Sequence, residues 1–189
     1  MAGRLVRGFK ADAERIALEV RRELNLRATD RFDAFAYAEY AGIPVTPLSA
    51  MEKFGATRDS IRRLSGDSAG FSAMTVFCGT ARLIVYNERH PSGRQANSLS
   101  HELSHLILEH PPVAAPFRDG RRLWDGRMEE EANWLAGALL VPRDGGLSWF
   151  RSGGSLGEGS VHFGVSPKLF EWRVNTTGVL RQLRALGSR

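Results

Sequence analysis

The sequence predicts an α+β protein that is mostly helical, with a small antiparallel β-sheet and a helix-turn-helix-like segment towards its C-terminus. Three observations support this fold class. Apolar residues recur with helical spacing in several segments, two β-rich runs flank a glycine turn, and a glycine-rich stretch precedes the last helices. A chain of 189 residues can bury one good core. We therefore expect a main domain over 1–150 and a C-terminal helical segment over 151–189 packed on it.

Composition limits the class of protein. The hydrophobic content of 42% and the charged content of 25% are ordinary for a globular protein. No run has membrane-spanning length, and residues 1–7 lack an apolar run of secretory length. The single cysteine, Cys78, excludes an internal disulfide and fits a reducing compartment, so we predict a cytoplasmic protein without membrane contact. A net charge of +5 permits contact with nucleic acid or an acidic partner but establishes neither.

Helices and one hairpin account for the first half of the chain. Helical spacing of apolar residues predicts helices over 11–25 and 31–41, and Gly42 supplies a stop signal for the second. The segment 43–48 contains two prolines and is an edge strand at best. Residues 49–64 are expected to be mostly helical, with a break near Gly55.

The β-rich runs Phe71–Phe77 and Ala81–Tyr86 predict a hairpin. A helix over about 93–109 follows it. This helix includes an apolar run without glycine or proline, from Leu99 to Leu108.

That run contains an H-E-x-x-H motif, His101 to His105. Residues four apart on a helix lie one turn apart and about 40° around its axis, so His101 and His105 point the same way. Two neutral imidazoles can hold one metal ion, and Glu102 is placed to act on a metal-bound water as a general base. The alternative interpretation is a surface helix with two unrelated histidines. It is less favoured because the sequence holds only 5 histidines and two of them fall at this spacing inside an apolar helix.

A helix over Met128–Val141 offers a third ligand. Carboxylates at 129–131 suit the N-terminus of a helix, so charge stabilisation is the alternative interpretation. Glu129 shares its side of the helix with small residues, so that side can approach another helix closely, whereas Glu131 borders an apolar arc. A metal held by His101, His105 and Glu129 would keep a fourth position for water. Asn133, one turn further on, is expected to hydrogen-bond to a ligand.

The remaining histidines are predicted to lie away from the metal. His110 follows His101 by nine residues, about 180° around a continuous helix, so we expect a helix-end or packing role. His90 and His162 stand singly in loop-like contexts. The polar segment 111–126, which contains Arg118, Arg121 and Arg122, is expected to be a loop that shapes access to the site.

The C-terminal part contains a candidate for DNA binding. Glycine-rich residues 143–160 are expected to form a loop. The sequence from Val161 to Arg173 then predicts a helix, a glycine turn and a second helix. Lys168 and Arg173 are its candidate DNA contacts. A helical hairpin that closes the domain is the preferred interpretation, so we expect weak or no direct DNA binding.

In order and spacing, several blocks resemble the ImmA/IrrE family of metallopeptidases. These blocks are Ile43-Pro44-Val45, Phe71-Ser72-Ala73 with the hairpin, the 101–105 motif, residues 129–133 with 139–142, and 163–166 with Arg173. The resemblance implies a zinc-peptidase core with His101, His105 and Glu129 as ligands and Glu102 as catalytic base. One departure is Ser104, which stands where glycine is frequent. We expect it on the solvent side of its helix.

Members of this family typically cleave a helix-turn-helix repressor and thereby switch on stress, phage or mobile-element genes. The resemblance therefore implies a zinc-dependent endopeptidase with such a repressor as its substrate, and manganese is the alternative metal. The alternative function is a regulator that binds DNA or a repressor, carries a structural metal and performs no proteolysis.

Overall fold

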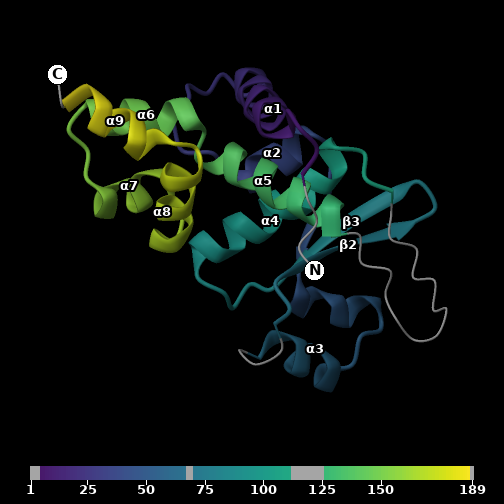
Figure 1. The fold of residues 1–189 in the computed structure, drawn as a ribbon. Coiled ribbons are helices and arrows are strands. Elements are labelled where there is room, and N and C mark those ends of the chain that lie inside the picture. The colour runs from purple at the N-terminus through teal and green to yellow at the C-terminus, as the bar shows by residue number, and fades with distance from the viewer. Residues whose placement is uncertain (1–4, 67–69, 112–125, 188–189) are drawn as a thin grey trace.

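The computed structural model describes residues 5–66, 70–111 and 126–187 (Figure 1). It confirms a mostly helical α+β fold with a small sheet. The first elements are α1 (Phe9–Glu23), α2 (Ala34–Tyr40), β1 (Val45–Pro47), the 3-10 helix η1 (Leu48–Phe54) and α3 (Arg58–Ser65). The predicted break near Gly55 separates η1 from α3, where Gly55 adopts a left-handed φ of 90°. The expected loop 111–126, with Arg118, Arg121 and Arg122, lies almost entirely outside the described residues.

The sheet has three strands in the order β1-β3-β2. The predicted hairpin is confirmed as β2 (Ala73–Cys78) and β3 (Ala81–Tyr86), which pair antiparallel with Thr75 opposite Ile84. The proline-containing segment forms β1, which pairs parallel with β3. The sheet is therefore mixed rather than purely antiparallel, because η1, α3 and β2 intervene between β1 and β3. β1 lies at an edge of the sheet, as the two prolines of the segment 43–48 require.

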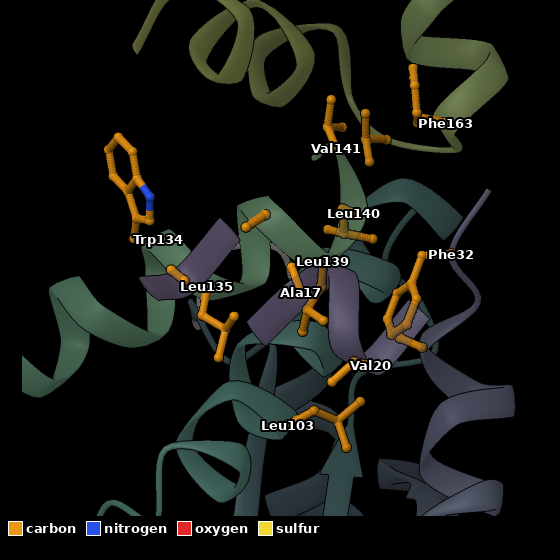
Figure 2. Packing of buried hydrophobic residues seen from close by; sticks show 14 of the residues in the cluster. Ala17, Val20, Phe32, Leu103, Trp134, Leu135, Leu139, Leu140, Val141 and Phe163 are labelled. Carbon is orange, nitrogen blue, oxygen red and sulfur yellow. The ribbon is translucent and has the colours of Figure 1, made fainter. Parts of the chain in front are cut away.

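Two long helices cross the middle of the molecule beside the sheet, α4 (Ser92–Ile107) and α5 (Gly126–Leu140) (Figure 1). They pack closely on each other, and α1 packs on α5. Ala17, Leu103 and Leu135 come from α1, α4 and α5, lie near one another and are fully buried (Figure 2). The small, buried Ala132 and Ala136 of α5 fit the prediction that one side of this helix can approach a neighbour closely.

The expected glycine-rich loop over 143–160 was wrong. This stretch forms α6 (Arg143–Arg151) and most of α7 (Leu156–Phe163). Glycine serves close packing here: a Cβ at Gly145 would lie 2.1 Å from the carbonyl oxygen of Ala28. A complete capping box, Ser155 with Glu158, begins α7 and overcomes the low helix propensity of its glycines.

The predicted helix, glycine turn and second helix are present. Helix α7 ends at Gly164, with a φ of 67°, and α8 (Pro167–Thr176) begins after the N-cap Ser166. Helix α9 (Val179–Gly187) follows, and α6 to α9 gather at one end of the molecule (Figure 1). The predicted boundary at residue 150 falls within α6, and the division into two units stays a prediction.

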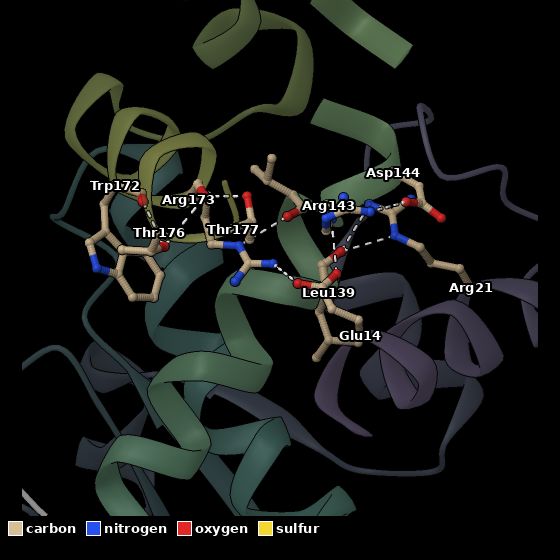
Figure 3. Close-up of polar contacts among 10 residues, drawn as sticks. Glu14, Arg21, Leu139, Arg143, Asp144, Trp172, Arg173, Thr176 and Thr177 are labelled. Atoms are coloured by element: carbon tan, nitrogen blue, oxygen red, sulfur yellow. Dashed lines mark hydrogen bonds and ion pairs between the residues drawn. The ribbon is translucent and has the colours of Figure 1, made fainter. Parts of the chain in front are cut away.

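Two buried arginines hold the C-terminal end of α5 (Figure 3). Arg21 of α1 donates to the carbonyl oxygen of Leu139 from Nε at 3.1 Å and from Nη2 at 2.9 Å. Arg173 of α8 donates to the carbonyl oxygen of Val141 at 3.1 Å and forms an ion pair with Glu14. These carbonyls have no partner inside the helix, so the arginines satisfy groups that would otherwise be buried unpaired. Both flanking helices thereby fix the position of α5.

Within the described ranges, no helix combines the length and the apolar character needed to cross a bilayer.

Candidate metal centre

Helix α4 presents the two motif histidines side by side. His101 and His105 lie one turn apart, and their Nε2 atoms are 3.1 Å from each other. The opposite side of this turn carries Leu99 and Leu103, which are fully buried in the core. The core therefore fixes the rotation of α4 and directs both imidazoles towards α5.

Helix α5 brings Glu129 to the same point. Its Oε2 is 3.2 Å from His101 Nε2, and its Oε1 is 3.7 Å from His105 Nε2. Ligand atoms of these three side chains all lie within 4.8 Å of one another. Among the described residues they form the single such cluster of His, Cys, Asp and Glu. The neighbouring Glu131 points elsewhere, towards His110.

Asn133 lies against His101, as its position one turn after Glu129 predicts. Its Oδ1 is 3.0 Å from His101 Nδ1. The amide oxygen can only accept, so His101 Nδ1 carries the proton and Nε2 is left to face the cluster. Asn133 thus orients the ring of His101.

Glu102 has a partner that sequence analysis did not identify. Thr75 Oγ1 on β2 donates to Glu102 Oε2 at 2.7 Å. The helix places Glu102 next to His101, close enough for its charge to act on that imidazole. Thr75 stands in an otherwise ordinary strand pattern, and only the packing of β2 against α4 brings the two side chains together.

His110 occupies a position that the helical projection did not predict. Its Nδ1 is 2.8 Å from His105 Nδ1, and its Nε2 is 3.2 Å from Glu131 Oε2. The projection assumed a continuous helix to residue 109, whereas α4 ends at Ile107. The chain then turns back, because Glu109 adopts a left-handed φ of 52°. The expected helix-end role therefore includes direct contact with a candidate ligand.

Charges at the cluster favour an ionised Glu129. The imidazoles of His101 and His105 lower the pKa of Glu129 to about 2, because each can donate to its carboxylate when protonated. Burial tends to lower the pKa of His101, but its hydrogen bond with Glu129 and the charges of Glu102 and Glu129 outweigh burial and raise it. Burial lowers the pKa of His110 despite its bond with Glu131. The cluster thus combines a carboxylate with imidazoles, and a cation suits that combination.

The departure at Ser104 has a structural explanation that differs from the expected one. Ser104 is fully buried rather than on the solvent side, and its Oγ donates to the carbonyl oxygen of Ser100 at 2.7 Å. The hydroxyl is satisfied within its own helix, so a buried serine is accommodated where the helix packs closely.

The other singled-out residues do not join the cluster. His90 is 6% exposed and lies against Asn87. His162 donates to the carbonyl oxygen of Thr29 at 2.7 Å and stacks on Trp149. Of the two candidate DNA contacts, Lys168 is exposed, but Arg173 is 1% exposed and is engaged inside the domain. Arg173 is therefore not on a surface that DNA can reach.

The cluster fits a metal ion by the chemistry of its donors. Two imidazole nitrogens and one carboxylate oxygen are the ligand set of many catalytic zinc sites, which reserve a further position for water. Each of the three side chains is partly buried, and their ligand atoms lie within 4.8 Å of one another. Glu102, which is outside the ligand set and held by Thr75, supplies a carboxylate for proton transfer.

Comparison with known proteins agrees with this site. The profile of the IrrE N-terminal-like domain, a peptidase family, matches residues 38–175. This range includes the sheet, the cluster of His101, His105 and Glu129, and most of α8. No curated protein matches the chain. Because the match covers most of the sequence, the chain belongs to the ImmA/IrrE family and is a metallopeptidase.

Proposed function

We propose that this protein is a cytoplasmic, zinc-dependent endopeptidase that cleaves a helix-turn-helix transcriptional repressor. Cleavage would derepress stress, phage or mobile-element genes. One observation carries the catalytic part of this proposal: His101, His105 and Glu129 converge from two helices, with Glu102 beside them. The class of substrate rests on the family resemblance.

The proposed roles follow from the contacts. His101 and His105 bind the metal through Nε2, and Glu129 binds it through a carboxylate oxygen. Asn133 holds the proton on His101 Nδ1 and so keeps Nε2 free to bind. When bound, the metal makes water acidic and polarises the peptide carbonyl.

Glu102 is proposed to move the proton. Its carboxylate accepts a proton from the attacking water and delivers it to the nitrogen of the leaving amine. Thr75 restricts the carboxylate by binding Oε2, and Oε1 is left for this transfer. Zinc is favoured over manganese because imidazole ligands suit zinc, whereas manganese prefers sites rich in oxygen.

The alternative, a DNA-binding or repressor-binding regulator with a structural metal, has less support. Arg173 is buried, and Phe170 and Val174 of the same helix are also buried. Trp172 packs edge-to-face on Trp134 at 5.6 Å between ring centroids. Helix α8 thus directs most of its large side chains into the protein, and Lys168 is the remaining candidate contact.

The test is a cleavage assay with purified full-length protein. The protein would be loaded with zinc and mixed with each helix-turn-helix protein found in the reading frames next to its gene. A single new N-terminus in the repressor, lost on chelation and restored by zinc, is the expected result. Stable binding without cleavage in the presence of zinc would favour the repressor-binding alternative instead.

A further inference from the structure

The end of α4 forms a turn that brings His110 back onto the helix. His110 N donates to the carbonyl oxygen of His105 at 2.9 Å, and Glu109 N donates to that of Leu106 at 3.2 Å. These two bonds form a Schellman motif, in which the residue with left-handed φ is usually glycine. Here that residue is Glu109. A non-glycine residue in this conformation costs of order 1 kcal/mol or more, so surrounding contacts hold the turn in place.

Behind the candidate ligand His105, the turn places the side chains of His110, Glu131 and Arg127 in a row. Glu131 Oε2 lies 3.2 Å from His110 Nε2, and His110 Nδ1 lies 2.8 Å from His105 Nδ1. Arg127 Nε lies 3.7 Å from the other oxygen of Glu131. Side chains of His110 and Glu131 are only 9% and 13% exposed, so water competes little for these contacts.

The hydrogen bonds that link His105, His110 and Glu131 can run in only one direction. A carboxylate accepts, so His110 Nε2 carries a proton and donates to Glu131. A neutral imidazole has one N–H, and His110 Nδ1 is therefore an acceptor. His105 Nδ1 must then donate, which leaves the lone pair of His105 Nε2 facing His101 and Glu129.

We propose that His110 and Glu131 are positioning residues that hold His105 in the tautomer whose Nε2 can bind the metal. This inference rests on the metal site of the proposed function. Both nitrogens of the His110 ring are occupied by Glu131 and His105, so His110 is not itself a ligand. Asn133 performs the same task for His101. An amide oxygen therefore orients His101, whereas a second imidazole orients His105.

Two measurements on full-length protein test the proposal without any use of activity. In the first, ¹⁵N chemical shifts of the His105 ring are recorded for metal-free protein at about pH 8.5, two units above the ordinary pKa of histidine. The neutral wild-type ring should carry its proton on Nδ1. A neutral wild-type ring protonated on Nε2 would overturn the proposal, whatever the variants do.

The second measurement is zinc affinity, obtained by competition with a chromophoric chelator. His110→Phe and Glu131→Leu should weaken zinc binding by about 10- to 100-fold. His110→Asn should retain most of the affinity, because its Oδ1 can still accept from His105 Nδ1. Glu130→Leu, one position from Glu131, is the matched control. Circular dichroism establishes that each variant is folded.

The outcomes separate this proposal from the proposed function. If folded His110→Phe keeps wild-type zinc affinity and the Nδ1–H tautomer, the positioning role is wrong while the peptidase proposal stands. If wild-type protein fails to bind zinc at His101, His105 and Glu129, the proposed function fails. The tautomer of metal-free His105 still decides the role of His110 in that case.

Discussion

Thr75 Oγ1 donates a 2.7 Å hydrogen bond to Oε2 of Glu102, which ties an edge strand of the sheet to the proposed catalytic base. A hydrogen bond to a charged group contributes about 1.5–3 kcal/mol. We expect Thr75→Val, which keeps the shape and removes the donor, to lower kcat by about tenfold or more. Zinc affinity should not change, because the hydrogen bond of Thr75 goes to Glu102, which is outside the ligand set.

Thr75→Ser is the matched control, since it retains a hydroxyl that can donate. It should keep most of the wild-type kcat. Steady-state kinetics together with zinc titration check both variants. A Thr75→Val enzyme with wild-type kcat would show that the bond does not orient Glu102 during the reaction.

Glu102→Gln should abolish proteolysis while metal content and fold stay intact. The amide keeps the shape and can still accept from Thr75, but it cannot accept a proton from water. Elemental analysis, thermal unfolding and a cleavage assay on the same preparation give the three readouts. Cleavage at the wild-type rate would exclude Glu102 as the base.

Glu129→Ala should lose zinc at chelator concentrations that the wild-type protein withstands. It removes the only carboxylate of the ligand cluster. Glu130→Ala serves as the control because it removes the same charge from the same helical turn. Equal zinc loss in both variants would point to a general effect of charge rather than to ligation by Glu129.

Zinc binding should release a proton near neutral pH. The pKa of His101 is raised above its ordinary 6.5 in the metal-free protein, so a proton competes with zinc below that raised value. Zinc affinity should therefore still rise with pH above 6.5 and level off once pH exceeds the raised pKa. Calorimetry in two buffers of different ionisation enthalpy measures the number of protons released for each zinc ion bound. Affinity that is already constant from pH 6.5 upwards would contradict the prediction.

The two candidate DNA contacts should behave differently. Arg173→Met removes a buried guanidinium bound to Glu14 and Val141, and breaking a buried ion pair costs about 3–5 kcal/mol. Glu14 is partly exposed, so the lower end of that range is expected. Lys168→Ala lies on the surface and should change the free energy of unfolding by less than about 0.5 kcal/mol. Denaturant unfolding gives both values.

A gel-shift assay with the neighbouring promoter completes this comparison. Wild-type protein should show weak, salt-sensitive retention without sequence preference. Sequence-specific retention that Lys168→Ala abolishes would favour the DNA-binding alternative.

Much of the fold could be predicted because local patterns determine it. Helical spacing located α1, α4 and α5 within two residues at each end, and the β-rich runs located the hairpin. Residues 143–160 were wrongly predicted as a loop because glycine has low helix propensity. In the structure, Gly145 and Gly159 instead allow backbone and ring atoms to approach closely. The parallel pairing of β1 depends on a long-range contact, which no local pattern contains.

In the candidate site too, local sequence patterns predict some features, whereas others depend on long-range contacts. The spacing of His101 and His105 follows from helix geometry, and the side of α5 that carries Glu129 follows from the placement of its small residues. Thr75 and His110 could not be found this way. Thr75 approaches Glu102 across 27 positions of sequence, and His110 depends on the residue at which α4 stops. A glutamate at the left-handed position after that helix gives no stop signal.

The two arginines that hold the end of α5 also affect how fast the metal site can assemble. Arg21 reaches Leu139 across 118 positions, and Arg173 reaches Val141 across 32. Contacts so distant in sequence require large loops to close, and this entropy must be lost before the contacts stabilise the chain. Helices α4 and α5 can form locally within about a microsecond, but their register depends on these distant contacts. The ligands are therefore expected to reach their final spacing late in folding, after the helices that carry them.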